Sequence, residues 1–462
     1  MIMSQLSSSQ LPPIPDDVVD LTHDSRAVRP GWMFACVVGE HFDGHDFASR
    51  AVADGASMLL VERELPLAIP QLVVPSVRAA MGPVAAEIHG HPANRLTMVG
   101  ITGTNGKTTT AHLMTVILTG AGRRTATIGT LSGVRTTPEA PDLQRQLAAY
   151  VDDDIEAVVM EVSSHALALH RVSGCRFDVS VFTNLGTDHL DLHHTMEEYF
   201  RAKASLFESN LSAAGVANID DPHGQLLVDV ASVPMEGFSM ADAQHLAVAA
   251  HRLTFVWRGM PIDVPIGGRF NVGNVLAALT ASETLGIDRA DAAASLIDCP
   301  PVPGRFEFVS EPEGPVTVIV DYAHTPDGMV ELLGAVRAVT HGGRVIVVFG
   351  CGGDRDAHKR PMMGAAAAEF ADVVIVTSDN PRHESPHAII ESIVAGAASV
   401  GGAPIVEPDR RAAIALALDM AETGDAVVIA GKGHETTQTI GDMAVPFSDR
   451  LVARELLGGG SP

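Results

Sequence analysis

Cysteines, basic residues and long apolar runs are scarce in this sequence, and each scarcity narrows the class of protein. Only four cysteines occur in 462 residues, none in C-x-x-C spacing, so neither a zinc site nor a disulfide framework is expected. The 31 basic residues face 56 acidic ones, and a formal net charge of −25 disfavours a general nucleic-acid binder. No run of about 18 apolar residues exists, and the N-terminus lacks the pattern of an export signal. We therefore expect a cytoplasmic protein with neither membrane insertion nor a nucleic-acid partner.

The composition that remains is that of a large globular protein. Hydrophobic residues make up 46% and charged residues 19% of the chain. Because 462 residues exceed one hydrophobic core, about three domains are expected. Proline-containing segments suggest boundaries that give domains over residues 1–92, 93–302 and 303–462.

The order of elements indicates the α/β class. Short β-branched runs alternate with Ala- and Leu-rich stretches, which is typical of domains with mostly parallel sheets. A short β insertion is expected within 245–270. The other expected strands are 33–38, 58–61, 96–101, 157–162, 179–183, 316–321, 344–349, 373–377 and 426–430.

A glycine-rich turn after the strand expected at 96–101 predicts a phosphate-binding loop. The turn ends in Gly106-Lys107-Thr108, where Lys107 can reach the outer phosphates of a nucleotide and the Thr108 hydroxyl can bind Mg²⁺. The match to G-x-x-x-x-G-K-[ST] is imperfect, because Ile101 stands where the first glycine belongs. The strand before the turn and the helix expected after it nevertheless favour nucleotide binding over an ordinary turn. The candidate residues are Gly103, Thr104, Asn105, Gly106, Lys107, Thr108 and Thr109.

Further polar clusters stand at expected strand ends, where ligands collect in open parallel sheets. Glu161 ends the strand over 157–162, and the segment 184–191, which contains His189, follows the strand over 179–183. Mg²⁺ prefers a few protein oxygens supplemented by water and phosphate, so these residues suit magnesium better than zinc. Lys203 lies in an amphipathic helix expected over 198–207. Each cluster taken alone is also compatible with solvated surface.

Together these motifs resemble the Mur ligases, the ATP-dependent enzymes that form the amide bonds of the peptidoglycan peptide. The motifs occur in the order of that family and cover most of the chain; they are 102–109, 161–165, 184–191, the helix of Lys203, 270–274, 304–307 and 321–327. The resemblance implies three domains, with a P-loop central ATPase domain and a Rossmann-like C-terminal domain. It also implies two Mg²⁺ ions, with ATP as a co-substrate.

The resemblance further implies roles for single residues. Lys107, Lys203 and His189 would be catalytic, and a carbamylated Lys203 would bind Mg²⁺ together with His189. Thr108 and Glu161 would hold the other Mg²⁺ against the ATP phosphates. Contacts to adenine, phosphate and ribose would come from Asn271, Arg305 and Asp321. Contacts to a UDP-sugar-peptide would come from Ser25, Thr136, Thr137, Ser163 and Arg171.

Within the family, the chain resembles the members that add the third residue of the peptide. A zwitterionic amino-acid end needs a planar donor for its carboxylate and an acceptor for its ammonium, and an arginine beside a carboxylate supplies both. By resemblance, Asp379-Asn380-Pro381-Arg382 marks the enzymes that use meso-diaminopimelate. The expected recognition set is Arg355, Asp379, Asn380, Pro381, Arg382, Gly431 and Glu435. The same four-residue segment could at the same time begin a helix, with Asp379 as its N-cap and Pro381 in its first turn.

The expected activity is addition of meso-diaminopimelate to the D-glutamate γ-carboxylate of UDP-N-acetylmuramoyl-L-alanyl-D-glutamate through an acyl phosphate, by a monomeric enzyme. Three alternatives stay open: a lysine-adding ligase of the same family, a folate-polyglutamate-type ligase, and a non-catalytic ATP-binding switch. The arginine of the four-residue motif and the N-terminal segment speak against the first two. The joint presence of Lys203, His189 and Glu161 speaks against the third, because a switch needs no second metal site.

Overall fold

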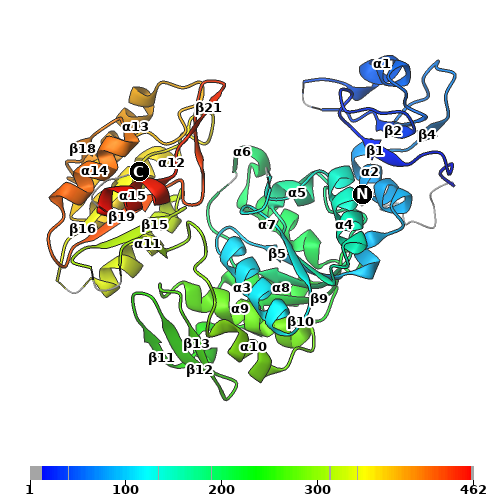
Figure 1. Cartoon of the computed structure of the whole chain (residues 1–462). Helices are drawn as coiled ribbons and strands as arrows, with labels where there is room; N and C mark the ends of the chain where they lie inside the picture. The colour runs from blue at the N-terminus through cyan, green and yellow to red at the C-terminus, as the bar shows by residue number, and fades with distance from the viewer. Residues whose placement is uncertain are drawn as a thin grey trace. The chain divides into compact units, whose positions relative to one another are not determined.

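The computed structural model describes residues 13–39, 41–133, 135–188, 190–311, 314–340 and 342–458, with only the backbone at 190 and 191. It divides into two compact units. Figure 1 labels its helices and strands. Unit 1 comprises Met1–Leu185, Thr195–Ser239 and Ala277–Ala292; unit 2 comprises Gly186–His194, Met240–Leu276 and Ala293–Pro462. No helix among the described residues has the length and apolar character needed to cross a bilayer.

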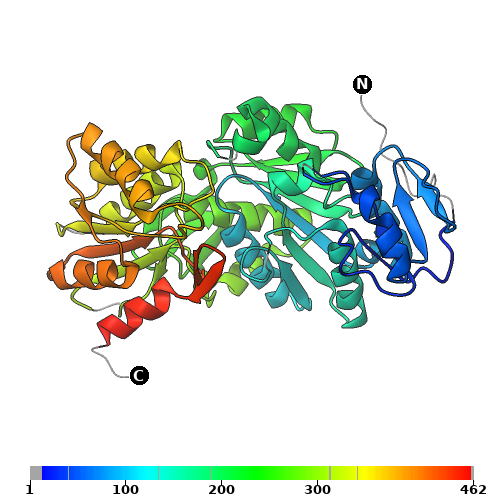
Figure 2. The same ribbon diagram turned by 90° about the horizontal axis from the view of Figure 1, so that it is seen from above.

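Unit 1 begins with a parallel four-stranded sheet, drawn in blue in Figure 2. Its strands, in sheet order, are β1 (Asp20–Thr22), β2 (Trp32–Ala35), β3 (Met58–Val61) and β4 (Gln71–Val73). Helices α1 (Ala48–Ala53) and α2 (Val77–Ile88) accompany it, and Ser76 caps α2 by accepting the Ala79 N–H. The carboxylate of Asp20 accepts hydrogen bonds from Arg145 Nε at 2.6 Å and His89 Nε2 at 3.1 Å. Arg145 belongs to the next part of the unit, so Asp20 ties the two parts together.

The second sheet of unit 1 is parallel, six-stranded and ordered β10-β9-β8-β5-β7-β6. Its strands are β5 (Thr97–Thr102), β6 (Thr125–Ile128), β7 (Ala157–Glu161), β8 (Phe177–Phe182), β9 (Ser212–Asn218) and β10 (Met235–Phe238). Since β5 lies between β7 and β8, the three carboxyl ends meet at one edge of the sheet. The helices of unit 1 in this part of the chain are α3 (Lys107–Gly120), α4 (Ala140–Asp152), α5 (Ser164–Ala168), α7 (Met196–Ala204) and α8 (Pro222–Val230). Helix α6 (Leu190–His193) belongs to unit 2, and α9 (Asn271–Thr284) and α10 (Arg289–Leu296) each contribute residues to both units.

The expected β insertion is confirmed as an antiparallel three-stranded sheet in unit 2. It consists of β11 (Gln244–Val248), β12 (Leu253–Trp257) and β13 (Met260–Val264). Leu253, Phe255 and Trp257 are buried and alternate with less buried neighbours, which is the two-residue period of a strand covered on one face.

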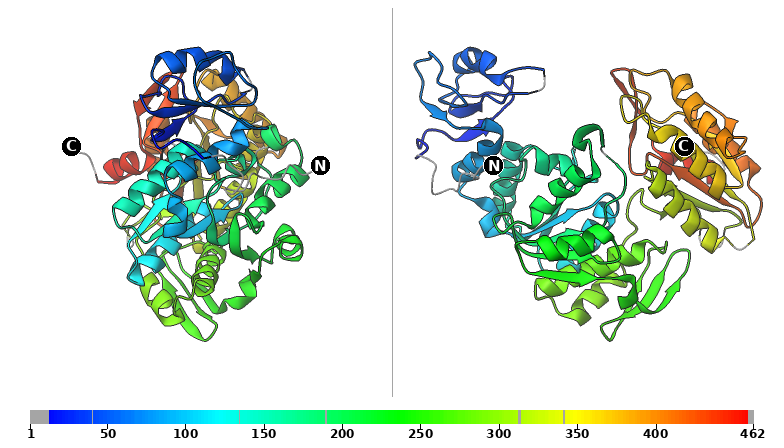
Figure 3. Two further views of the ribbon diagram at one scale, coloured as in Figure 1. Left: turned by 90° about the vertical axis from the view of Figure 1, so that its right-hand side faces the viewer. Right: turned by 180° about the vertical axis from the view of Figure 1, so that it is seen from behind.

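The last domain of unit 2 is a six-stranded sheet ordered β14-β15-β19-β16-β17-β18, shown from two further directions in Figure 3. Only β14 runs antiparallel to its neighbour. The strands are β14 (Glu307–Phe308), β15 (Thr317–Asp321), β16 (Val345–Phe349), β17 (Val373–Val376), β18 (Ile405–Val406) and β19 (Ala426–Ala430). A hairpin of β20 (Thr437–Ile440) and β21 (Met443–Pro446) follows.

Helices cover both faces of this last sheet. Val345 and Val347 pack in a core that includes side chains of α11 (Pro326–Val339), α12 (Lys359–Phe370) and α13 (Pro386–Ser399). Ile346 and Val348 point to the other face and pack with α14 (Arg410–Met420) and α15 (Asp449–Leu457). This doubly wound arrangement is the expected Rossmann-like domain.

All nine expected strands exist, with ends shifted by a few residues. The strand expected over 33–38 ends at Ala35, and the expected helix over 198–207 is α7 followed by a 3-10 turn, Ser205–Phe207. The strands that sequence reasoning missed are short or poor in β-branched residues, such as Ser212–Asn218. Such segments are stabilised as strands by neighbours in the sheet rather than by their own propensity.

Candidate functional site

The candidate phosphate loop connects β5 to α3 in a conformation that depends on glycine. Gly103 has φ +151° and Gly106 has φ +85°, and a Cβ on Gly103 would lie 1.9 Å from Thr183 Oγ1. Gly106 is the N-cap of α3, so the first turn of that helix, beginning at Lys107, opens onto the loop. A helix N-terminus with glycine before it favours an anion through its dipole and its backbone N–H groups.

Two lysines far apart in sequence converge on this loop. The Nζ of Lys107 donates to Gly103 O at 2.7 Å, and the Nζ of Lys203, on α7, donates to the same oxygen at 2.8 Å. Lys203 is only 1% exposed, and its ammonium lies 4.5 Å from the centre of the Tyr199 ring. A surface role for Lys203 is therefore wrong, and both cations stand where nucleotide phosphates are expected.

Glu161 lies at the same edge of the sheet and is 2% exposed. Its Oε2 accepts from Thr108 Oγ1 at 3.0 Å, and its Oε1 accepts from Thr130 N at 2.8 Å. The interpretation of Glu161 as a solvated carboxylate is thus wrong. A buried carboxylate beside the threonine of a phosphate loop is a hard oxygen pair that fits Mg²⁺, with phosphate oxygens and water as its other ligands.

The other candidate metal ligands are less complete. His189 lies outside the described residues, and no group of three or more His, Cys, Asp or Glu side chains that could hold a metal is found among those described. Asn184, in the same segment, is fixed to the phosphate loop, because its Oδ1 accepts the Asn105 N–H at 2.9 Å. An unmodified Lys203 ammonium cannot ligate a cation, so a metal role there requires the carbamylated form.

Four of the candidate sugar-peptide residues lie together next to Glu161. The hydroxyl of Thr137 donates to Glu161 O at 2.9 Å and accepts from Ser163 N at 3.1 Å. Arg171 Nη1 donates to Thr137 O at 3.3 Å, and Thr136 Oγ1 lies 3.1 Å from Thr130 Oγ1. Ser25 lies instead in the turn after β1, next to the first sheet of unit 1.

The candidate nucleotide residues of unit 2 belong to segments that meet at Phe306, whose ring lies 5.5 Å from that of Phe270, the neighbour of Asn271. Asp321, at the end of β15, accepts the Phe306 N–H at 2.6 Å, and burial raises the pKa of this carboxyl. The guanidinium of Arg305 lies 4.3 Å from the centre of the Tyr322 ring. Asn271, at the start of α9, is 1% exposed and donates to Gly267 O at 2.7 Å.

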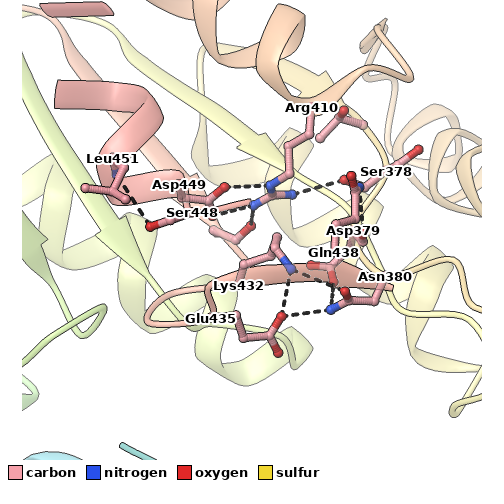
Figure 4. A network of polar contacts seen from close by, with 12 residues as sticks. Ser378, Asp379, Asn380, Arg410, Lys432, Glu435, Gln438, Ser448, Asp449 and Leu451 are labelled. Atoms are coloured by element: carbon pink, nitrogen blue, oxygen red, sulfur yellow. Dashed lines mark hydrogen bonds and ion pairs between the residues drawn. The ribbon is translucent and has the colours of Figure 1, made fainter. Parts of the chain in front are cut away.

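The candidate amino-acid residues gather at the carboxyl ends of β17 and β19 (Figure 4). Asn380 Nδ2 donates to Asp379 Oδ1 at 2.9 Å and to Glu435 Oε2 at 2.8 Å. Gly431 approaches Asp379 so closely that a Cβ would lie 2.6 Å from the Asp379 carboxylate. Burial raises the pKa of Asp379, although the charges of Arg410 and Lys432 oppose that shift.

Arg382 and Arg355 belong to loops next to this cluster. Arg382 has φ +48°, its Nη1 donates to Gly353 O at 2.6 Å, and its backbone pairs with the β20–β21 hairpin. Both arginines lie close to Gly352: a Cβ added there would be 3.0 Å from Arg382 Nη1 and 3.7 Å from Arg355 Cγ. Helix α13 begins only at Pro386, so the prediction of a helix capped by Asp379 is wrong.

Sequence reasoning missed two charged groups in this cluster. Lys432 has a fully buried ammonium that donates to Glu435 Oε2 and to Thr437 O, both at 2.7 Å. Arg410 forms a fully buried ion pair with Asp449 at 2.7 Å and donates to the carbonyls of Ser378 and Ala430 (Figure 4). Lys432 lies in the polar, glycine-rich stretch 431–435, and Arg410 belongs to a pair of arginines that begins an Ala- and Leu-rich segment. Neither pattern identifies a partner.

The chain combines a phosphate loop and a buried carboxylate at the edge of a parallel sheet with a doubly wound domain. This combination defines a nucleotide-binding α/β enzyme. Three family models match almost the whole chain in order: "Mur ligase family, catalytic domain" over 18–98, "Mur ligase middle domain" over 101–282 and "Mur ligase, glutamate ligase domain" over 304–433. The chain belongs to the Mur ligase family.

Named relatives agree with that assignment over nearly the full length. The chain is 44% identical over 463 residues to the UDP-N-acetylmuramoyl-L-alanyl-D-glutamate--2,6-diaminopimelate ligase of Geobacillus thermodenitrificans, covering 95% of this chain and 94% of the relative. A solved structure of an enzyme with that name matches with a TM-score of 0.67 and 33% identity, over 95% and 94% of the two chains. The fold is shared with MurF ligase from Thermotoga maritima, crystallised with ADP, at a TM-score of 0.64, 21% identity and coverage of 96% and 97%.

Proposed function

We propose that this protein is the ATP-dependent ligase that adds meso-diaminopimelate to UDP-N-acetylmuramoyl-L-alanyl-D-glutamate in the cytoplasm. The observation that carries the proposal is the cluster at the ends of β17 and β19. There the carboxylates of Asp379 and Glu435 lie with Asn380 beside the loop of Arg382. Carboxylates accept hydrogen bonds from an ammonium and a guanidinium binds a carboxylate, so the cluster suits the zwitterionic end of diaminopimelate.

The reaction that this arrangement supports has two steps. The γ-carboxylate of the D-glutamate attacks the γ-phosphate of ATP, which forms an acyl phosphate and releases ADP. The amine of diaminopimelate then attacks the acyl carbon, and the tetrahedral intermediate expels phosphate. The chain contributes mostly by positioning its substrates and by stabilising charge.

Lys107 is the residue closest to the phosphoryl chemistry in this proposal. Its ammonium donates to the carbonyls of Gly103 and Thr104. A change of side-chain rotamer would bring it to a phosphate bound in the loop. Thr108 and Glu161 would hold Mg²⁺, which when bound neutralises charge on the phosphates. Thr137 and Ser163 would orient the acyl substrate, because Thr137 is held in place by hydrogen bonds to Ser163 N and to Glu161 O.

The carbamylation of Lys203 is part of the same proposal. Its burial beside the phosphate loop favours a modified form, because a carbamate carries a negative charge that a cation can bind. Carbon-labelled CO₂ should give the signal of a lysine carbamate in the wild-type protein and no such signal in Lys203→Ala. The domain limits near residues 92 and 302, the monomeric state and the lack of a nucleic-acid partner stay predictions.

The test of the function is phosphate release from ATP by the purified protein with the UDP-sugar-dipeptide and one of three additions: meso-diaminopimelate, L-lysine or no amino acid. We expect release only with diaminopimelate, with the amide product detected by mass spectrometry. Release with L-lysine would keep the ligase and overturn the specificity. Failure with every amino acid, while ATP still binds, would favour the ATP-binding switch.

A further inference from the structure

Three arginines converge on one buried carboxylate beside the candidate sugar-peptide residues. Glu139, just before α4, is 6% exposed. It pairs with Arg171 at 2.9 Å, with Arg78 of α2 at 3.2 Å, and with Arg135. Arg171 also donates to Thr137 O, and Thr137 is bonded to Glu161. Thr137 therefore connects the cluster to the backbone of Glu161, the residue whose carboxylate is proposed to hold Mg²⁺.

The charges of this cluster do not balance. Three guanidiniums against one carboxylate leave a surplus of two positive charges. The two neighbouring carboxylates Asp142 and Asp20 are both bonded to Arg145, at 2.8 and 2.6 Å, so these three groups together offset only one of the two surplus positive charges.

Titration of the surroundings agrees with that surplus. The pKa of Arg171 is lowered by burial and by Arg135 and Arg78, although Glu139 opposes the shift. Burial and the charge of Arg78 also lower the pKa of His170. In addition, the buried Nε of Arg171 has no hydrogen-bond partner among the described residues. Arg171 is the most buried of the three arginines, with a side chain 14% exposed against 26% for Arg78 and 55% for Arg135. A buried cation without enough counter-charge is costly unless an anion joins it.

We propose that Arg78 and Arg135 complete, with Arg171, an anion-binding subsite for the acyl substrate, with Glu139 as the internal counter-ion that holds the three guanidiniums together. This inference rests on the proposed function. The ligand chemistry is a phosphate or carboxylate carrying up to two negative charges. The UDP-sugar-dipeptide offers both, in its pyrophosphate and in its D-glutamate carboxylates. Guanidinium forks bind either group with paired hydrogen bonds.

The test measures binding of the UDP-sugar-dipeptide by calorimetry, without turnover, to the wild type, Arg78→Gln and Arg135→Gln. Each variant should weaken binding about tenfold to a hundredfold, the range for a lost charge-assisted hydrogen bond, while ATP affinity changes less than about twofold. Arg124→Gln is the matched control, because it removes the same charge from unit 1 at an exposed arginine paired with Asp154 and Glu156. Affinities of both variants equal to the control would overturn the proposal.

Two further arms keep the test decisive. Arg78→Lys retains the positive charge, so recovered binding in that variant, at unchanged thermal stability, supports an electrostatic role. Equal losses of binding in Arg78→Lys and Arg78→Gln, together with lowered melting temperatures in both, would assign the cluster to structure alone. UDP used as a competing ligand separates the sources: weaker UDP binding in the Gln variants assigns the subsite to the pyrophosphate, and unchanged UDP binding assigns it to a carboxylate. Product formation by the wild type, measured separately, tests the function itself.

Discussion

The buried ion pair of Arg410 and Asp449 provides the sharpest prediction about stability. Both side chains are fully buried, and the pair joins α14 to α15 with two hydrogen bonds of 2.7 and 2.8 Å. Burial alone would lower the pKa of Arg410, but attraction to Asp449 outweighs it and raises that pKa, so the guanidinium stays charged. Asp449→Asn would leave that charge uncompensated inside the domain. Removing one member of a buried pair costs about 3–5 kcal/mol in the free energy of unfolding.

That free energy can be measured as a melting temperature. For a domain of about 150 residues, 1 kcal/mol corresponds to a shift of about 2–4 °C, so Asp449→Asn should lower the melting temperature of the C-terminal domain by about 6–20 °C. Scanning calorimetry records this shift, and hydrogen exchange in α15 localises it. Amino-acid binding should weaken too, because Arg410 also holds the carbonyls of Ser378 and Ala430.

The same two helices contain a matched control. Arg411 and Glu455 form an ion pair between α14 and α15, but their side chains are 46% and 54% exposed. Water and salt screen such a pair, so Glu455→Gln should cost less than about 1 kcal/mol. If Asp449→Asn cost no more than Glu455→Gln, the claim that burial makes the first pair critical would be refuted. The double variant Arg410→Met/Asp449→Leu should recover part of the loss, since no charge is then left unpaired.

Three further predictions concern other parts of the chain. Burial would raise the pKa of Asp20, but hydrogen bonds from His89 and Arg145 outweigh it and lower that pKa from 3.8 to about 2. The ionised carboxylate therefore adds about 2 kcal/mol to the free energy of unfolding above pH 4, and this contribution is lost as the pH falls towards 2. In urea titrations at several pH values, Asp20→Asn should flatten the loss of stability between about pH 4 and 2, and an unchanged pH dependence would contradict the prediction. Gly103→Ala should weaken ATP binding at least about tenfold in a fluorescent-nucleotide assay, because the new Cβ would collide with Thr183. Gly122→Ala should leave ATP binding unchanged, because a Cβ at that position has no other atom within 4 Å. Lys432→Met should raise the KM for the amino acid about tenfold or more and leave the KM for ATP nearly unchanged, because it leaves Glu435 without its buried cation; equal effects on both constants would argue for general unfolding.

Sequence reasoning succeeded where a local pattern determines local structure. The phosphate loop was predictable, because glycine with positive φ, a lysine and a threonine act within one turn between a strand and a helix. The central strands were predictable for a similar reason, since their β-branched runs are buried on both faces.

Prediction from the sequence failed where a side chain's position depends on partners that are distant in the chain. Nothing near Lys203 in the sequence predicts a hydrogen bond to Gly103, and the convergence follows only from the packing of α7 against the sheet edge. Lys432 and Arg410 were missed for the same reason, because a buried charge is recognised by its partner, which lies elsewhere in the chain. The family resemblance supplied Lys203 in advance, but it did not supply the arginine cluster at Glu139.

Helix α15 has a consequence for the synthesis of the chain. Besides Asp449, it contributes Arg454, which donates to Glu307 in β14 at 3.0 Å, so the last helix of the described residues joins the strand that begins the domain. Until α15 has left the ribosome, Arg410 lacks its counter-ion and Glu307 lacks this partner. A nascent C-terminal domain therefore cannot complete its native contacts strand by strand, and the clusters at Asp321 and Asp379 should reach their native state together, once α15 has been translated.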